Sequence, residues 1–259
     1  MYTIQRAIQH MQSGQWQQAI VVLHEVPQSF QSCNFLGIAY QMSQNWSGAK
    51  QAWEQALHYN PDSEDVRLNL GIACIAIGEK SAAELHWLHI LKFNAHHVQS
   101  LINLGLLYRE QERNQQAHDC WQKALDSTPN QSKIIEWLAD VKGILGKEAL
   151  TLGKVKEAEI LLKKAVSMDP TYSVLWGTLS EWHLHTGDLS EALKACTKAI
   201  DLEPQDPNLL NLNGNIYRMM GENEMALKMY REAIKYDGRN ELILNSIAEL
   251  TSGESHQKE

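Results

Sequence analysis

Histidine and cysteine are the side chains in this chain that could support metal or nucleophilic chemistry. Among 11 histidines in 259 residues, His86 and His89 have the i, i+3 spacing that places two imidazoles on one face of a helix. No cysteine or carboxylate supplies an obvious third and fourth ligand beside them. The four cysteines lie far apart without a CxxC spacing, at Cys33, Cys74, Cys120 and Cys196. We therefore expect no metal site, no cofactor and no enzymatic activity.

The charge balance limits the kinds of partner. Lys and Arg total 23 against 31 Asp and Glu, a formal charge of −8. Phosphate recognition needs a concentrated cationic surface, so nucleic acid is not the expected partner, and neither is an anionic membrane surface. No stretch is apolar enough to cross a bilayer, and no apolar signal segment follows the first residues. With sparse cysteine as well, these features predict a cytoplasmic protein that does not insert into membranes.

Small and large apolar residues recur along the chain at a fixed interval. Trp53, Trp87 and Trp121 are separated by equal steps of thirty-four, and a Leu-Gly pair recurs at the same interval before them. An alanine recurs in seven copies, each time twelve residues after a Gly, Ala or Ser: Ala19, Ala49, Ala83, Ala117, Ala158, Ala192 and Ala226. A period of this length indicates stacked helix pairs, in which the small residues let the helices approach closely.

The pattern of Leu-Gly, an aromatic residue, Ala and a second aromatic residue resembles the tetratricopeptide repeat (TPR). The resemblance implies an all-α fold, a right-handed superhelical solenoid of antiparallel helix pairs. It divides residues 1–250 into copies at about 1–29, 30–63, 64–97, 98–131, 132–172, 173–206 and 207–240, followed by a capping helix at 241–250 and a flexible tail at 251–259. Glycines at 14, 78, 153, 187 and 221 are expected to end the first helices in the left-handed conformation.

Two intervals depart from the period, and the first of them, from Ala19 to Ala49, is four residues short. The interval from Ala117 to Ala158 exceeds the usual repeat interval by seven residues. Seven residues are nearly two turns of an α-helix, so the insert can lengthen the first helix of the fifth copy, roughly Ser132 to Leu152, without turning its apolar face away. The alternative is a bend between an N-terminal and a C-terminal arm.

The resemblance also implies a concave groove lined by the first helix of each pair. By register, the groove residues are Asn34, Ile38, Gln41, Asn69, Ile72, Asn103, Leu106, Arg109, Asn211, Asn215 and Arg218. Asn69 and Asn103 are one repeat interval apart and form two rungs of an amide ladder, which suits the backbone of an extended ligand. The aliphatic members suit a hydrophobic peptide or the apolar face of a helix. Arg218, with Asn211 and Asn215, could hold one carboxylate.

Two functions fit these features. The first is an adaptor that binds a peptide or helix of a partner protein in the groove. The alternative is a scaffold that self-associates through head-to-tail contacts between repeats. An assembler would change its apparent mass with concentration, whereas an adaptor would stay monomeric until a partner is added.

Overall fold

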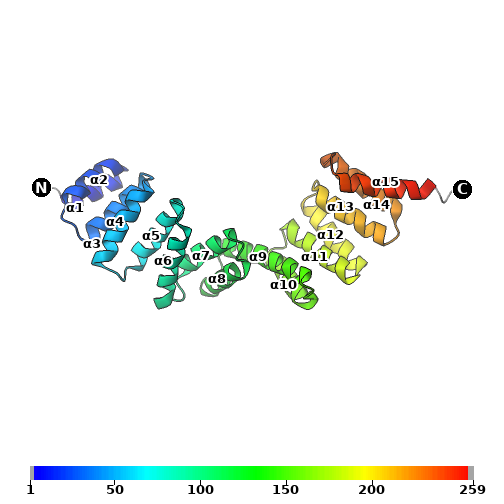
Figure 1. Cartoon of the computed structure of the whole chain (residues 1–259), viewed down its shortest axis with the longest axis horizontal. Helices are drawn as coiled ribbons and strands as arrows, with labels where there is room; N and C mark the ends of the chain where they lie inside the picture. The colour runs from blue at the N-terminus through cyan, green and yellow to red at the C-terminus, as the bar shows by residue number, and fades with distance from the viewer. Residues whose placement is uncertain (1–2, 256–259) are drawn as a thin grey trace. The chain divides into compact units, whose positions relative to one another are not determined.

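The computed structural model describes residues 3–255. Within that range the chain forms fifteen α-helices and no strand, which confirms the predicted all-α class (Figure 1). The helices group into two compact units, the first ending at Asn130 and the second beginning at Gln131. The single solenoid expected over residues 1–250 therefore stays a prediction.

Unit 1 is a stack of four helix pairs. Its helices are α1 (Ile4–Gln12), α2 (Trp16–Glu25), α3 (Phe30–Met42), α4 (Trp46–Tyr59), α5 (Glu64–Ala76), α6 (Lys80–Phe93), α7 (Val98–Glu110) and α8 (Asn114–Ser127). Each odd-numbered helix packs on the even-numbered helix that follows it, and α2, α4 and α6 also pack on the next pair.

Unit 2 is built in the same way and ends on a single helix. Its helices are α9 (Ser132–Thr151), α10 (Val155–Met168), α11 (Ser173–Thr186), α12 (Leu189–Leu202), α13 (Pro207–Met219), α14 (Asn223–Tyr236) and α15 (Glu241–Ser255). The last helix packs on α14 and starts at Glu241, as predicted. It continues to Ser255, so the boundary predicted at residue 250 lies five residues too early. Thr251 Oγ1 donates to the Ile247 carbonyl at 3.0 Å and stays within the helix. Residues 256–259 of the predicted tail lie outside the described range.

The recurring glycines allow the large residue of the same pair to reach the helix backbone. A Cβ added at Gly71 or Gly105 would lie closer than 3.0 Å to the indole nitrogen of Trp87 or Trp121. Copy six has Ser180 at this register, and the facing residue is Cys196, which is much smaller than tryptophan. Ser180 Oγ donates to the Ala192 carbonyl at 2.8 Å, so its buried hydroxyl is satisfied. In copy six, a small facing residue therefore accompanies the replacement of glycine by serine.

The turn inside each helix pair needs a left-handed residue. Gly14, Gly78, Gly153, Gly187 and Gly221 have φ between 70° and 84°, which confirms the predicted caps. Copies two and four lack this glycine, yet Gln44 and Glu112 take φ of 60° and 59° at the same register. The shared geometry of the turn therefore overrides the preference of these two residues.

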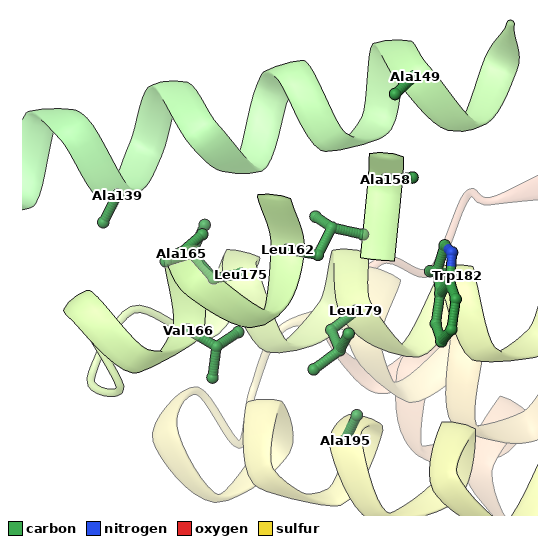
Figure 2. Packing of buried hydrophobic residues seen from close by; sticks show 10 residues of the cluster. All are labelled: Ala139, Ala149, Ala158, Leu162, Ala165, Val166, Leu175, Leu179, Trp182 and Ala195. Atoms are coloured by element: carbon green, nitrogen blue, oxygen red, sulfur yellow. The ribbon is translucent and has the colours of Figure 1, made fainter. Parts of the chain in front are cut away.

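The seven-residue insert lengthens one helix. The helix α9 has 20 residues, and its buried side includes Leu138, Ala139 and Ala149. Figure 2 shows Ala139 and Ala149 above Leu162 and Ala165 of α10, in the buried cluster that continues into α11 and α12. The apolar face therefore remains continuous along the longer helix, as the near-integral number of turns predicts.

Candidate peptide-binding groove

Three buried tryptophans fix the first helices of their pairs. Each indole Nε1 donates to an acceptor 19 residues earlier: Trp53 to Asn34 Oδ1 at 3.2 Å, Trp87 to the Leu68 carbonyl at 3.2 Å and Trp121 to the Ile102 carbonyl at 3.4 Å. A buried indole N–H needs such a partner. These bonds, with the glycine contacts above, fix the rotation of α3, α5 and α7 about their axes. The remaining side chains of these helices are positioned by that rotation.

An apolar hollow lies between α5 and α7, and we call it the α5–α7 hollow. Its lining residues come from three helices of unit 1: Ile72, Ile75, Trp87, Asn103, Leu106, Leu107 and Glu110. Its volume is about 230 Å³. Small-molecule pockets usually measure roughly 300–1,000 Å³, so this hollow fits one large apolar side chain better than a cofactor. Leu106 at its edge is 43% exposed.

Asn103 brings an amide to this hollow. Its Oδ1 accepts a hydrogen bond from Gln99 Nε2 at 3.1 Å. Its Nδ2 is buried and finds no acceptor among the described residues. A buried donor without a partner costs about 1–3 kcal/mol, which an acceptor brought by a ligand would recover. Asn69, the other predicted rung, is half-buried on α5 and is not one of the lining residues.

The hollow gathers Ile72, Asn103 and Leu106 of the predicted groove residues in unit 1 and leaves out the others. Asn34 is held by the Trp53 indole, which occupies its Oδ1. The other predicted residues outside the hollow are half-buried: Ile38 and Gln41 on α3, Asn69 on α5 and Arg109 on α7.

Two of the three predicted residues of unit 2, Asn215 and Arg218, contact the C-terminal helices. Asn215 Oδ1 accepts a hydrogen bond from the Tyr230 hydroxyl of α14 at 2.8 Å. Arg218 Nη1 lies 3.3 Å from Glu249 Oε2 of α15. The arginine that was predicted to bind a carboxylate of a ligand is therefore paired with a carboxylate of this chain. Asn211 is half-buried on α13. A larger hollow of about 540 Å³ between α11 and α12 includes none of these three residues.

Four lining residues were not among the predicted groove residues: Ile75, Trp87, Leu107 and Glu110. The repeat spacing marks Trp87 as an interior residue. Its side chain is 3% exposed, and it also forms part of the wall of the hollow. Glu110 forms an ion pair with Lys80 at 2.7 Å, a contact between neighbouring helix pairs. The signal that could have identified Glu110 was a charged residue at the end of a Leu-rich helix, because the rim of a binding surface is usually polar.

The titratable side chains offer little chemistry. Burial raises the pKa of Cys120 and Cys196 to about 11, so both thiols are protonated at neutral pH. Burial, followed by the charge of Arg67, lowers the pKa of both His86 and His89. No group of His, Cys, Asp or Glu within the described range could hold a metal ion.

Four models of the tetratricopeptide repeat match the chain, over residues 36–89, 98–128, 149–216 and 208–240. Human protein O-mannosyl-transferase TMTC1 is 29% identical over 172 residues, which are 65% of this chain and 19% of that protein. Hsp70-Hsp90 organizing protein 1 of Glycine max is 27% identical over 126 residues, which are 49% of this chain and 22% of that protein. The chain thus spans about a fifth of the length of either relative.

A solved structure has the same fold. It is the TPR protein YrrB, described as having an unusual peptide-binding site. The TM-score is 0.57 at 20% identity, with 76% of this chain and 98% of that chain covered. None of the helices within residues 3–255 is long and apolar enough to cross a membrane.

Proposed function

The chain belongs to the tetratricopeptide repeat family, and from that premise we propose that it is a non-catalytic adaptor that binds an extended peptide of a partner protein at the α5–α7 hollow. The observation that carries the proposal is the convergence of Ile72, Asn103 and Leu106 on one hollow. Register alone selects these three positions, and the hollow they line is the size of a single side chain. The peptide-binding site named for YrrB supports the same kind of function.

The hollow would take one bulky aliphatic or aromatic side chain of the peptide. Its walls are Ile72, Ile75, Leu106 and Leu107, and Trp87 adds an aromatic surface. Transfer of such a side chain out of water is the main favourable contribution. Charged side chains are disfavoured here because the walls offer no counter-charge except Glu110, which already pairs with Lys80.

Asn103 favours an extended ligand over a helical one. In a helix, the backbone carbonyls are already bonded within the helix, whereas an extended peptide presents them freely. The free Nδ2 of Asn103 is a donor of the kind such a carbonyl needs. A small rotation of this side chain would bring the buried nitrogen to the ligand.

Peptides selected from a random dodecapeptide display library against the intact chain would test this site. Leu106→Ala removes part of one wall, and we expect a loss of about 1–1.5 kcal/mol, or roughly five- to tenfold in Kd, measured by fluorescence anisotropy. Leu244→Ala is the matched control, because Leu244 is 44% exposed and lies on α15 of unit 2. Equal affinities for the two variants would refute the hollow as the binding site.

Self-association remains the alternative. Apolar side chains are exposed at both ends of the described chain, Val21 on α2 at 58% and Leu242 on α15 at 76%. Sedimentation over a range of concentrations separates the two functions, because only a self-associating scaffold gains mass without a partner.

The cytoplasmic location also stays a proposal. All four cysteines are free thiols, as expected in a reducing compartment.

A further inference from the structure

The hollow between α11 and α12 is large enough for a small molecule, and we call it the α11–α12 hollow. Its volume is about 540 Å³, against about 230 Å³ for the α5–α7 hollow. Pockets for small molecules usually measure roughly 300–1,000 Å³. The α11–α12 hollow therefore has more room than one peptide side chain needs, and all its lining residues belong to unit 2.

Apolar side chains of both helices form the walls of this hollow. Trp176 and Leu179 of α11 line it together with Leu193 and Ala195 of α12, and Figure 2 shows Leu179 above Ala195. The Trp176 indole Nε1 donates to the Pro170 carbonyl at 2.9 Å, so its one polar atom is satisfied and its ring offers an aromatic surface. These walls favour a ligand with an apolar, aromatic body.

A buried polar atom at this hollow lacks a partner. His183 lines the hollow and is only 9% exposed, and its Nδ1 forms no hydrogen bond with any residue that the structure describes. An unpaired buried polar atom is costly, so a ligand that pairs with it gains affinity. Nδ1 is itself covered, and a turn of the imidazole about its Cβ–Cγ bond, a torsion with broad preferences, would bring it to the ligand.

A comparison with copy four shows why His183 has no partner in its own chain. Tyr108 stands at the same register in copy four, and its hydroxyl donates to Glu84 of the preceding pair at 3.0 Å. The counterpart of Glu84 in α10 is Glu159, which pairs with Lys163 at 2.6 Å. The imidazole of His183 is also shorter than a phenol. Copy six therefore keeps a buried polar atom that the preceding pair does not satisfy.

The imidazole of His183 is neutral, and this decides which group can pair with it. Burial is the main influence and lowers the pKa of His183 from its ordinary value of 6.5, an effect that Lys163 reinforces. The charges of Asp188, Glu191 and Glu159 act in the opposite direction. A neutral imidazole has one donor and one acceptor nitrogen, and Nδ1 can be either. A hydroxyl group both donates and accepts, so it can pair with Nδ1 in both tautomers.

The charged residues that line the hollow cancel one another. Glu191 and Lys194 form an ion pair at 2.5 Å, and Lys198 and Asp201 add one charge of each sign. A charged ligand would lose part of its hydration here without meeting a net counter-charge. The lining therefore favours a neutral ligand.

We propose that the α11–α12 hollow binds a small neutral phenol, a molecule that combines an aromatic body with a hydroxyl group. The aromatic body packs against Trp176, Leu179 and Leu193, and the hydroxyl group pairs with His183 Nδ1. The α11–α12 hollow shares no lining residue with the α5–α7 hollow, so this site is additional to the proposed peptide-binding site and does not depend on it.

Three ligands with the same two-ring body test the proposal: 2-naphthol, naphthalene and 2-naphthoate, which carry a hydroxyl group, a hydrogen and a carboxylate at one position. The Kd of each is measured by NMR titration of the intact chain, followed at the indole N–H of Trp176. We expect 2-naphthol to bind about tenfold more tightly than naphthalene, because only the hydroxyl group can pair with Nδ1. 2-Naphthoate should bind more weakly than 2-naphthol, because the hollow offers its charge no net counter-charge. Equal affinity for 2-naphthol and naphthalene, or tighter binding of 2-naphthoate than of 2-naphthol, would overturn the proposal.

The decisive variant is His183→Phe, which keeps a ring at this place and removes the unpaired nitrogen, so it should fold and should abolish the preference for 2-naphthol over naphthalene. His185→Phe is the matched control, because His185 is exposed on the same helix, and it should keep the preference. Ala195→Leu installs the residue that α10 carries at the same register, Leu161, and by filling the hollow it should weaken both ligands by at least about tenfold. A preference that survives in His183→Phe, or unchanged affinities in Ala195→Leu, would overturn the proposal. So would tighter binding of N-acetyltyrosinamide than of 2-naphthol, since a tyrosine of a peptide would then be the ligand.

Discussion

Exchanging one glycine–tryptophan pair for the smaller pair of copy six would test how the repeats are held together. A Cβ at Gly71 would lie less than 3.0 Å from three atoms of the Trp87 indole, and Trp87 is only 3% exposed. In copy six, the same register carries Ser180 and Cys196, both fully buried. The perturbation is therefore Gly71→Ser, Trp87→Cys and the two together.

The magnitudes follow from the packing. Gly71→Ser forces the indole out of place, and overpacking of this kind costs about 1–3 kcal/mol in free energy of unfolding. Trp87→Cys empties most of the indole volume, and comparable truncations cost about 3–5 kcal/mol. In the double variant the clash disappears, because no indole remains to meet the serine. The combined loss should then fall short of the sum by about 1–3 kcal/mol.

The assay is urea denaturation followed by far-ultraviolet circular dichroism, with all four proteins measured together. Hydrogen exchange in α5 and α6 checks that the loss is local to this pair. If the two single losses add within about 0.5 kcal/mol, the close approach of glycine and tryptophan does not explain the recurrence of glycine.

Two further predictions concern the turns and the ion pairs. Gln44→Gly and Glu112→Gly should each raise the free energy of unfolding by about 0.5–1 kcal/mol, because both residues have positive φ. Gly153→Ala is the reverse change at the same register and should lower the free energy of unfolding by a similar amount. A change of the same sign in all three variants would contradict the reasoning. The pKa of Glu84 is lowered chiefly by its hydrogen bonds from Arg113, so this carboxylate stabilises the fold above its ordinary pKa of 4.5, and that contribution is lost as the pH falls through the lower folded value. Denaturation at pH 7 and pH 3 should therefore show a smaller acid-induced loss in Arg113→Gln than in the intact chain, and an equal loss would exclude this pair as a source of the pH dependence.

The repeat and its main helix boundaries could be predicted because they depend on the sizes of side chains that are close in sequence and pack within one helix pair. A glycine twelve residues before an alanine, with a large residue following, can be read from the sequence and corresponds to contacts within one helix pair. The lengthened α9 was predictable for a similar reason, since seven residues preserve the apolar face. Positive φ at Gln44 and Glu112 was not predictable from residue type, because the neighbouring helices impose it.

The candidate site could be predicted only in part, because its polar residues depend on partners elsewhere in the chain. Asn34 and Asn103 were both predicted to line the groove, but the side-chain oxygen of Asn34 accepts a hydrogen bond from the indole of Trp53, 19 residues later. Arg218 meets Glu249, 31 residues later, through a helix whose docking the repeat does not specify. The aliphatic residues Ile72 and Leu106 were easier to place, because register alone decides which face they occupy.

The most direct test of the central claim is methyl NMR of the intact chain, with isoleucine and leucine methyl groups labelled, during titration with a display-selected peptide. The account predicts the largest shift changes at Ile72, Ile75, Leu106 and Leu107, with little change at Leu244 of unit 2. Changes that leave these four residues unaffected and concentrate elsewhere would contradict peptide binding at the α5–α7 hollow.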